Sequence, residues 1–120
     1  MVKKAPTTHR IAVLAAQVLD DNKALDIQIL DVRKLTSVTD FMIIATGRSS
    51  RHVKALADHV AVAVRTAGHD LLGIEGESAA EWILIDLGDA IVHVMQAQTR
   101  AFYQLEKLWA PLPARKAAAE

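Results

Sequence analysis

Residues 81–96 constrain the fold more than any other stretch, because they contain two short apolar runs separated by Gly88-Asp89, in the sequence EWILIDLGDAIVHVMQ. A glycine in the first central position favours a type II′ hairpin turn, and that turn fixes how the two strands pair. The predicted cross-strand pairs are Ile83 with Val94, Ile85 with Val92, and Leu87 with Ala90. All these side chains lie on one face and are apolar, so this face is expected to belong to the core.

The opposite face of the predicted hairpin mixes apolar and polar side chains. It carries Trp82, Leu84, Asp86, Ile91, His93 and Met95. A carboxylate, an imidazole and an indole that are buried together each need a hydrogen-bonding partner. We therefore predict that this face meets a partner molecule. The alternative is that a helix of the same chain covers it.

Composition excludes several classes of protein. The chain has 120 residues and is 52% hydrophobic, which suits one domain with a real core. Equal numbers of basic and acidic residues, 14 of each, argue against a general binder of nucleic acids or membranes. The absence of cysteine excludes disulfides and cysteine-ligated zinc. With no apolar run of about 18 residues and no signal-peptide core, we expect a soluble cytoplasmic protein.

The spacing of apolar residues predicts three helices. The first begins near Thr8 and ends near Asp21-Asn22. The second follows Gly47 and ends before Gly68, with a buried stripe of Val53, Leu56, Ala57, Val60 and Val64. The third spans about residues 97–109 and is expected to bury Phe102, Leu105 and Leu108.

Five strands complete the predicted fold. Besides the two hairpin strands, they lie at residues 25–31, 41–46 and 71–75. In the first of these, Leu25, Ile27 and Ile29 share one side, whereas the continuous apolar run at 41–46 indicates a central strand. The expected fold class is α/β, a mixed five-stranded sheet flanked by helices. We expect one domain, residues 8–110, between flexible segments at residues 1–7 and 111–120.

Acidic residues gather around the predicted hairpin. Residues 75–89 contain no Lys or Arg and five acids, namely Glu75, Glu77, Glu81, Asp86 and Asp89. Such a patch beside an unusual sheet face favours a basic protein partner, because complementary charge steers association. Solvated loop charges would give the same pattern.

The sequence contains no complete set of catalytic residues. Gly47-Arg48-Ser49-Ser50 can hold a phosphate on free backbone N–H groups, but simple capping of the following helix explains it equally well. A nucleotide-binding transferase using this junction with Arg48 and Arg51 is the alternative function. His52 and His59 are too far apart along one helix to share a metal ion, and no carboxylate pair suits a two-metal site. We therefore predict a protein that is not an enzyme and has no cofactor or metal.

Several segments resemble the ribosomal silencing factor family (RsfS, also called Iojap-like). They are LDVRKLTSVTDFMIIATGRSSRHVKALADHV, GIEGESAAEWILIDLGDAIVHVMQ and TRAFYQLEKLWA, in this order. The resemblance implies a protein that docks on the fourteenth protein of the large ribosomal subunit, where the small subunit would join. It implies repression of translation when nutrients are scarce. It also implies a fold similar to nucleotidyltransferases without their catalytic acids.

The resemblance and the residues lead to one predicted partner-binding surface. Trp82 is its expected anchor, with Leu84, Ile91 and Met95 around it. His93 and Tyr103 are expected to form hydrogen bonds at the rim. The acids expected to pair with a basic ribosomal protein are Glu75, Glu77, Asp86 and Asp89. A minor contact with ribosomal RNA and a homodimer of the free protein remain open alternatives.

Overall fold

The computed structural model describes residues 7–109, and the side chains of residues 10–109. Its helices are α1 (Thr7–Asp21), α2 (Ser50–Thr66), α3 (Ala97–Tyr103) and α4 (Leu105–Trp109). Its strands are β1 (Leu25–Asp31), β2 (Phe41–Gly47), β3 (Gly73–Glu75), β4 (Trp82–Asp86) and β5 (Ala90–Gln96). The expected flexible segments lie outside the described residues, except that Thr7 already belongs to α1.

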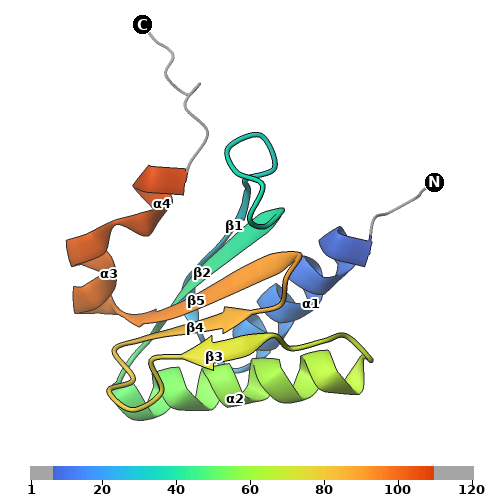
Figure 1. Cartoon of the computed structure of the whole chain (residues 1–120). Coiled ribbons are helices and arrows are strands. Elements are labelled where there is room, and N and C mark those ends of the chain that lie inside the picture. Colours follow the sequence, from blue (N-terminus) through green and yellow to red (C-terminus); the bar gives the residue numbers. More distant parts are fainter. Residues whose placement is uncertain (1–6, 110–120) are drawn as a thin grey trace, which may run out of the picture.

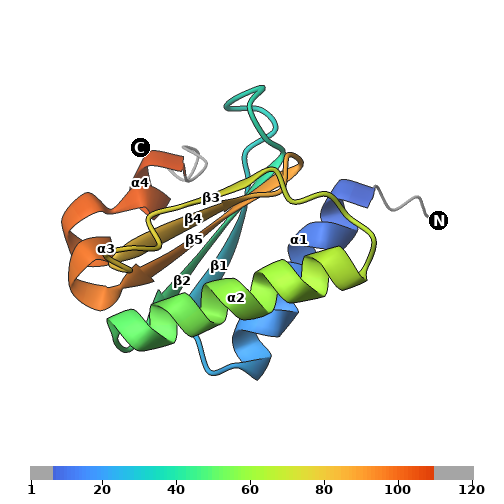
Figure 2. The same ribbon diagram turned by 60° about the horizontal axis from the view of Figure 1, so that its bottom comes forward.

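The strands form one mixed sheet in the order β1-β2-β5-β4-β3, as Figure 1 shows. Only β2 and β5 run parallel, and the other neighbours are antiparallel. Helices α1 and α2 cover one face, whereas α3 and α4 lie on the other side of the sheet (Figure 2). The predicted fold class, a five-stranded α/β domain, is confirmed.

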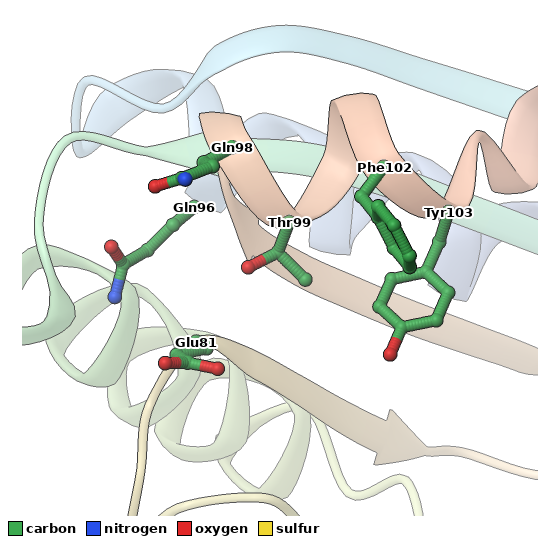
Figure 3. A pocket seen from close by; sticks show the side chains of 6 residues that line it. All are labelled: Glu81, Gln96, Gln98, Thr99, Phe102 and Tyr103. Atoms are coloured by element: carbon green, nitrogen blue, oxygen red, sulfur yellow. The ribbon is translucent and has the colours of Figure 1, made fainter.

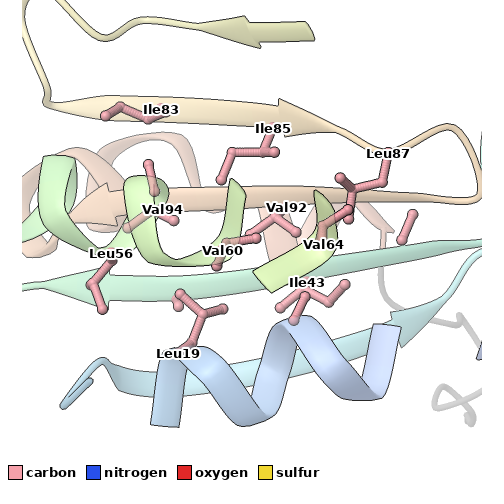
Figure 4. Packing of buried hydrophobic residues seen from close by; sticks show 14 of the residues in the cluster. Leu19, Ile43, Leu56, Val60, Val64, Ile83, Ile85, Leu87, Val92 and Val94 are labelled. Carbon is pink, nitrogen blue, oxygen red and sulfur yellow. The ribbon is translucent and has the colours of Figure 1, made fainter. Parts of the chain in front are cut away.

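The hairpin has the predicted register. Ile83 pairs with Val94 and Ile85 with Val92, while Gly88 adopts a positive φ of 82° in the turn. The apolar face of the hairpin packs against α2 and α1, as Figure 4 shows. The side chains at the centre of this core are fully or almost fully buried, among them Leu19, Ile43, Leu56, Val60, Val64, Ile83, Ile85, Leu87, Val92 and Val94.

Helix α2 begins and ends where the sequence predicts. The Ser49 side chain caps its first turn by accepting a hydrogen bond from the His52 backbone N–H at 3.1 Å. At the other end, Gly68 has a φ of 82°, and the N–H of His69 reaches the Val64 carbonyl, as in a Schellman motif. The five predicted stripe residues are all buried.

Three local predictions were wrong. A bulge interrupts β1 between Leu25 and Gln28, so its simple alternation fails and Ile29 is 42% exposed. Strand β3 is shorter than predicted and begins at Gly73. The third predicted helix is broken at Gln104, whose φ and ψ are both 50°, a left-handed conformation.

The break at Gln104 changes which side chains of the last helix are buried. Leu105 is buried as predicted, but Phe102 and Leu108 are 79% and 72% exposed. In a single continuous helix, successive side chains are rotated around the helix axis by a constant angle of about 100°, before and after residue 104. Left-handed Gln104 interrupts this regular rotation, so the predicted apolar stripe does not form.

Candidate functional site

The second face of the hairpin has the predicted pairs and is partly covered by the chain itself. Trp82 lies opposite Met95, Leu84 opposite His93, and Asp86 opposite Ile91. Met95 is fully buried against Ile44 and Leu105, with Trp109 packed beside them, while Ile91 packs with Val32 and Met42.

The expectation that all six side chains face a partner is therefore not met in this structure. His93, Ile91 and Met95 are buried, because β5 lies at the centre of the sheet and α3 and α4 pack over that part. Trp82, Leu84 and Asp86 stay half-buried on β4, which lies nearer the sheet edge beside the short β3.

Two side chains, His93 and Tyr103, hold the indole of Trp82 in position. Its Nε1–H donates a hydrogen bond of 3.0 Å to Nδ1 of His93, and its ring lies 4.9 Å from the Tyr103 ring. An indole N–H only donates, so Nδ1 of His93 accepts and the neutral imidazole carries its proton on Nε2. His93 thus positions Trp82 from a buried site and does not lie at the exposed rim where we expected it.

Burial keeps His93 uncharged. It is only 5% exposed, and desolvation lowers its pKa from 6.5 to about 4. Its Nε2 has no hydrogen-bond partner among the described residues. The imidazole is therefore a neutral acceptor for the indole at physiological pH.

The predicted acids lie on β3 and at the two ends of β4, near the edge of the sheet. Glu75 pairs with Leu84 across the β3–β4 ladder, so both side chains lie on the second face. Glu77 belongs to the loop before β4, whereas Asp89 belongs to the turn after it. Because β4 has five residues, these two ends lie roughly 15 Å apart.

Some of these acids have partners within the chain. Glu77 lies 3.7 Å from Nζ of Lys54, and Asp89 lies 3.7 Å from Nε2 of His69. Asp86 accepts a hydrogen bond from the backbone N–H of Gly88 at 2.8 Å, which stabilises the hairpin turn. Residues 75–89 contain no Lys or Arg in the sequence, but in the folded chain Lys54 of α2 lies beside this acidic patch.

We name the exposed part of the second face the β4 strip. It consists of Trp82, Leu84 and Tyr103 with the acids Glu75 and Asp86 beside them, while Glu77 and Asp89 lie at the two ends of β4 with their carboxylates near Lys54 of α2 and His69 just after it. Tyr103 is 53% exposed and reaches the strip from α3. The strip thus combines an apolar centre with negative charge at both ends.

A buried arginine that the sequence analysis missed holds the C-terminal helices in place. Arg100 donates hydrogen bonds to Glu106 at 2.9 Å, to the Asp26 carbonyl at 2.7 Å and to the Thr46 hydroxyl at 2.9 Å. It therefore links α3 and α4 to β1 and β2. Its neighbours in α3 are mostly exposed, so nothing in the sequence around Arg100 indicates that this residue is buried.

The Gly47–Ser50 junction has the structure of a helix cap. Ser49 is occupied in capping α2, and Nδ1 of His52 accepts the backbone N–H of Arg48 at 2.9 Å. A guanidinium N–H of Arg48 donates to the Lys23 carbonyl. Within residues 10–109, no group of three or more His, Asp or Glu side chains is arranged to hold a metal ion. No helix within residues 7–109 is long and apolar enough to cross a membrane.

Comparison with known proteins defines the class of this chain. A crystal structure from Chromobacterium violaceum superposes with a TM-score of 0.84 at 45% identity, covering 92% of this chain and 93% of that one. The sequence model of the family described as "Ribosomal silencing factor during starvation" matches residues 5–120. The chain belongs to the ribosomal silencing factor family, which is regulatory and not enzymatic.

Two curated relatives carry the same family name. "Ribosomal silencing factor RsfS" of Haemophilus influenzae is 52% identical over 94 residues, which are 78% of this chain and 92% of the relative. "Ribosomal silencing factor RsfS" of Chromobacterium violaceum is 50% identical over 101 residues, covering 84% and 83%. The predicted family is confirmed, and the transferase alternative finds no support in these names.

Proposed function

We propose that this protein binds the fourteenth protein of the large ribosomal subunit and blocks joining with the small subunit. Translation would then be repressed in the cytoplasm when nutrients are limiting. The observation that carries this proposal is the β4 strip, in which the half-exposed indole of Trp82 stands between Tyr103 and Leu84 with acids at both ends. The family name supports the general activity, since relatives are called ribosomal silencing factors.

The chemistry of the strip suits a basic ribosomal protein. A standard interface buries about 800 Å² per partner, and a few aromatic or arginine anchors provide most of the binding energy. Trp82 is a suitable anchor, because His93 and Tyr103 hold its ring while part of it stays exposed. Glu75, Glu77, Asp86 and Asp89 would attract cationic side chains and orient the partner.

Buried residues of the second face have a supporting role in this proposal. His93 orients the indole, while Ile91 and Met95 connect β5 to the packing around α4. Silencing by this route needs no catalytic group, because a bound protein of this size excludes the other subunit by volume. The fraction of subunits silenced then depends on the concentration of the protein relative to its dissociation constant.

Two further contacts are compatible with this proposal. A homodimer of the free protein would bury the apolar centre of the β4 strip and so compete with the ribosome. A minor contact with ribosomal RNA would involve exposed cations elsewhere, such as Arg48 and Arg51. Both are separate outcomes of a binding experiment across a range of protein concentrations.

Co-sedimentation with separated ribosomal subunits tests the proposal. The purified chain should sediment with large subunits alone, and should reduce joining when small subunits are added afterwards. It should also bind the isolated fourteenth protein. Sedimentation with small subunits only, or large-subunit binding that leaves joining unchanged, would refute the proposed mechanism.

A further inference from the structure

A hollow lies beside the β4 strip, between the start of β4 and helix α3. Its volume is about 310 Å³, and Figure 3 shows the side chains that line it: Glu81, Gln96, Gln98, Thr99, Phe102 and Tyr103. Only Tyr103 belongs to the β4 strip. This volume is at the lower end of the roughly 300–1,000 Å³ typical of small-molecule sites, which leaves room for one side chain.

The polar side chains of the hollow offer hydrogen-bond acceptors. The carboxylate of Glu81 is exposed and makes no hydrogen bond or ion pair with any other residue in the described part of the chain. The amide N–H of Gln96 is already donated to the Ala80 carbonyl at 3.2 Å, which leaves its Oε1 free to accept. The Thr99 hydroxyl provides a further acceptor on the same side. None of the lining residues is Lys or Arg.

Two aromatic rings form the other wall. Phe102 is 79% exposed, and its ring meets that of Tyr103 edge-on at 4.9 Å. Phe102 therefore contributes little to the core, although its neighbour Tyr103 continues the aromatic row to Trp82. The faces of such rings attract cations, and planar cations can also stack on them.

We propose that this hollow binds an arginine side chain of the partner protein. A guanidinium is planar, carries five N–H donors and no acceptor, and stacks on aromatic faces. It would pair with Glu81, donate to Gln96 and Thr99, and lie against Phe102. Lysine fits less well, because its ammonium is compact and cannot stack. This inference rests on the proposed function for the identity of the partner, but the chemistry of the hollow can be tested alone.

Titration of the full chain with N-acetyl-arginine amide, followed by NMR, tests the hollow without any ribosome. The backbone amides of Glu81, Thr99 and Phe102 should shift on titration. N-acetyl-lysine amide should bind several-fold more weakly, and N-acetyl-glutamine amide should cause no shifts there. Glu81→Gln should weaken arginine binding roughly tenfold. Equal shifts with the lysine and arginine probes, or unchanged binding by Glu81→Gln, would overturn the proposal.

Large-subunit binding then distinguishes a partner arginine from a free guanidinium compound. Glu81→Gln and Phe102→Leu should each weaken binding of large subunits roughly tenfold. Asp20→Asn removes the same charge from an exposed position of α1, on the other side of the sheet, and should bind like the wild type. Circular dichroism checks that all three variants are folded.

The two proposals fail in different ways. If the wild type does not bind large subunits, the proposed function is wrong, and the partner arginine with it, whatever the NMR titration shows. If the wild type binds and both hollow variants bind equally well, the partner arginine is wrong while the proposed function stands. Weakening by both variants, but not by Asp20→Asn, supports the arginine site.

Discussion

Burial of His93 makes the stability of this fold depend on pH below neutrality. Its pKa is lowered to about 4 in the folded chain, whereas the imidazole of the unfolded chain titrates near 6.5. Between these values the unfolded chain binds a proton that the folded chain does not. The contribution is therefore complete above about pH 6.5 and is lost as the pH falls toward 4.

The size of this effect follows from the two pKa values. The full difference corresponds to about 3 kcal/mol, and the part lost between about pH 7.5 and pH 5 is about 2 kcal/mol. The structure gives the physical reason. Protonation of Nδ1 would remove the acceptor of the Trp82 N–H and would leave a buried cation without a carboxylate partner in the described part of the chain.

Urea unfolding of the wild type and of His93→Gln at these two pH values measures the contribution. Glutamine can accept the hydrogen bond from Trp82 but does not titrate. The wild type should lose about 2 kcal/mol more than the variant on acidification. The other histidines and the carboxylates are present in both chains, so their contributions cancel. An equal loss in both proteins would show that His93 does not remain neutral and buried in the folded state.

Two further predictions concern the β4 strip. Trp82→Ala should weaken large-subunit binding by at least about 2 kcal/mol, with a smaller loss of unfolding free energy than the roughly 2–5 kcal/mol expected for the fully buried Ile85→Ala. Urea midpoints and subunit affinities of both variants test this, and equal destabilisation would contradict the role of Trp82 as a partner-facing anchor. Glu77→Lys and Asp89→Lys should slow association at low salt without unfolding the chain, and unchanged affinity there would show that these acids are only solvated surface.

The sequence predicted those parts of the fold in which local and tertiary preferences agree. The Gly88 turn and the alternation of Ile83 and Ile85 sufficed for the hairpin register, because a slip by one residue would expose the whole apolar set. The Ser49 cap and Gly68 likewise marked the ends of α2. In each case a local backbone preference and a buried stripe indicate the same structure.

The candidate site was predicted less completely, because its exposure depends on contacts between distant segments. The residues facing away from the core were identified, and a covering helix of the same chain was the stated alternative, but which of these residues α3 and α4 bury was not predicted. That cover depends on Arg100, which joins the Asp26 carbonyl and Thr46 across the sheet. It also depends on left-handed Gln104, a conformation for which glycine or asparagine is the usual signal. Neither feature is visible in hydrophobic periodicity.

The packing around Trp82 indicates which residues of the β4 strip would affect the dissociation rate and which the association rate. His93 and Tyr103 hold the indole of Trp82 before any partner arrives, so little side-chain entropy remains to be lost on binding. Such a preorganised anchor should act mainly on the dissociation rate, whereas the flanking acids should act mainly on the association rate and its salt dependence. Because the hydrogen bond to His93 requires a neutral imidazole, the orientation of the anchor and the folding stability depend on the same buried group. The proton that destabilises the fold would therefore also release the anchor.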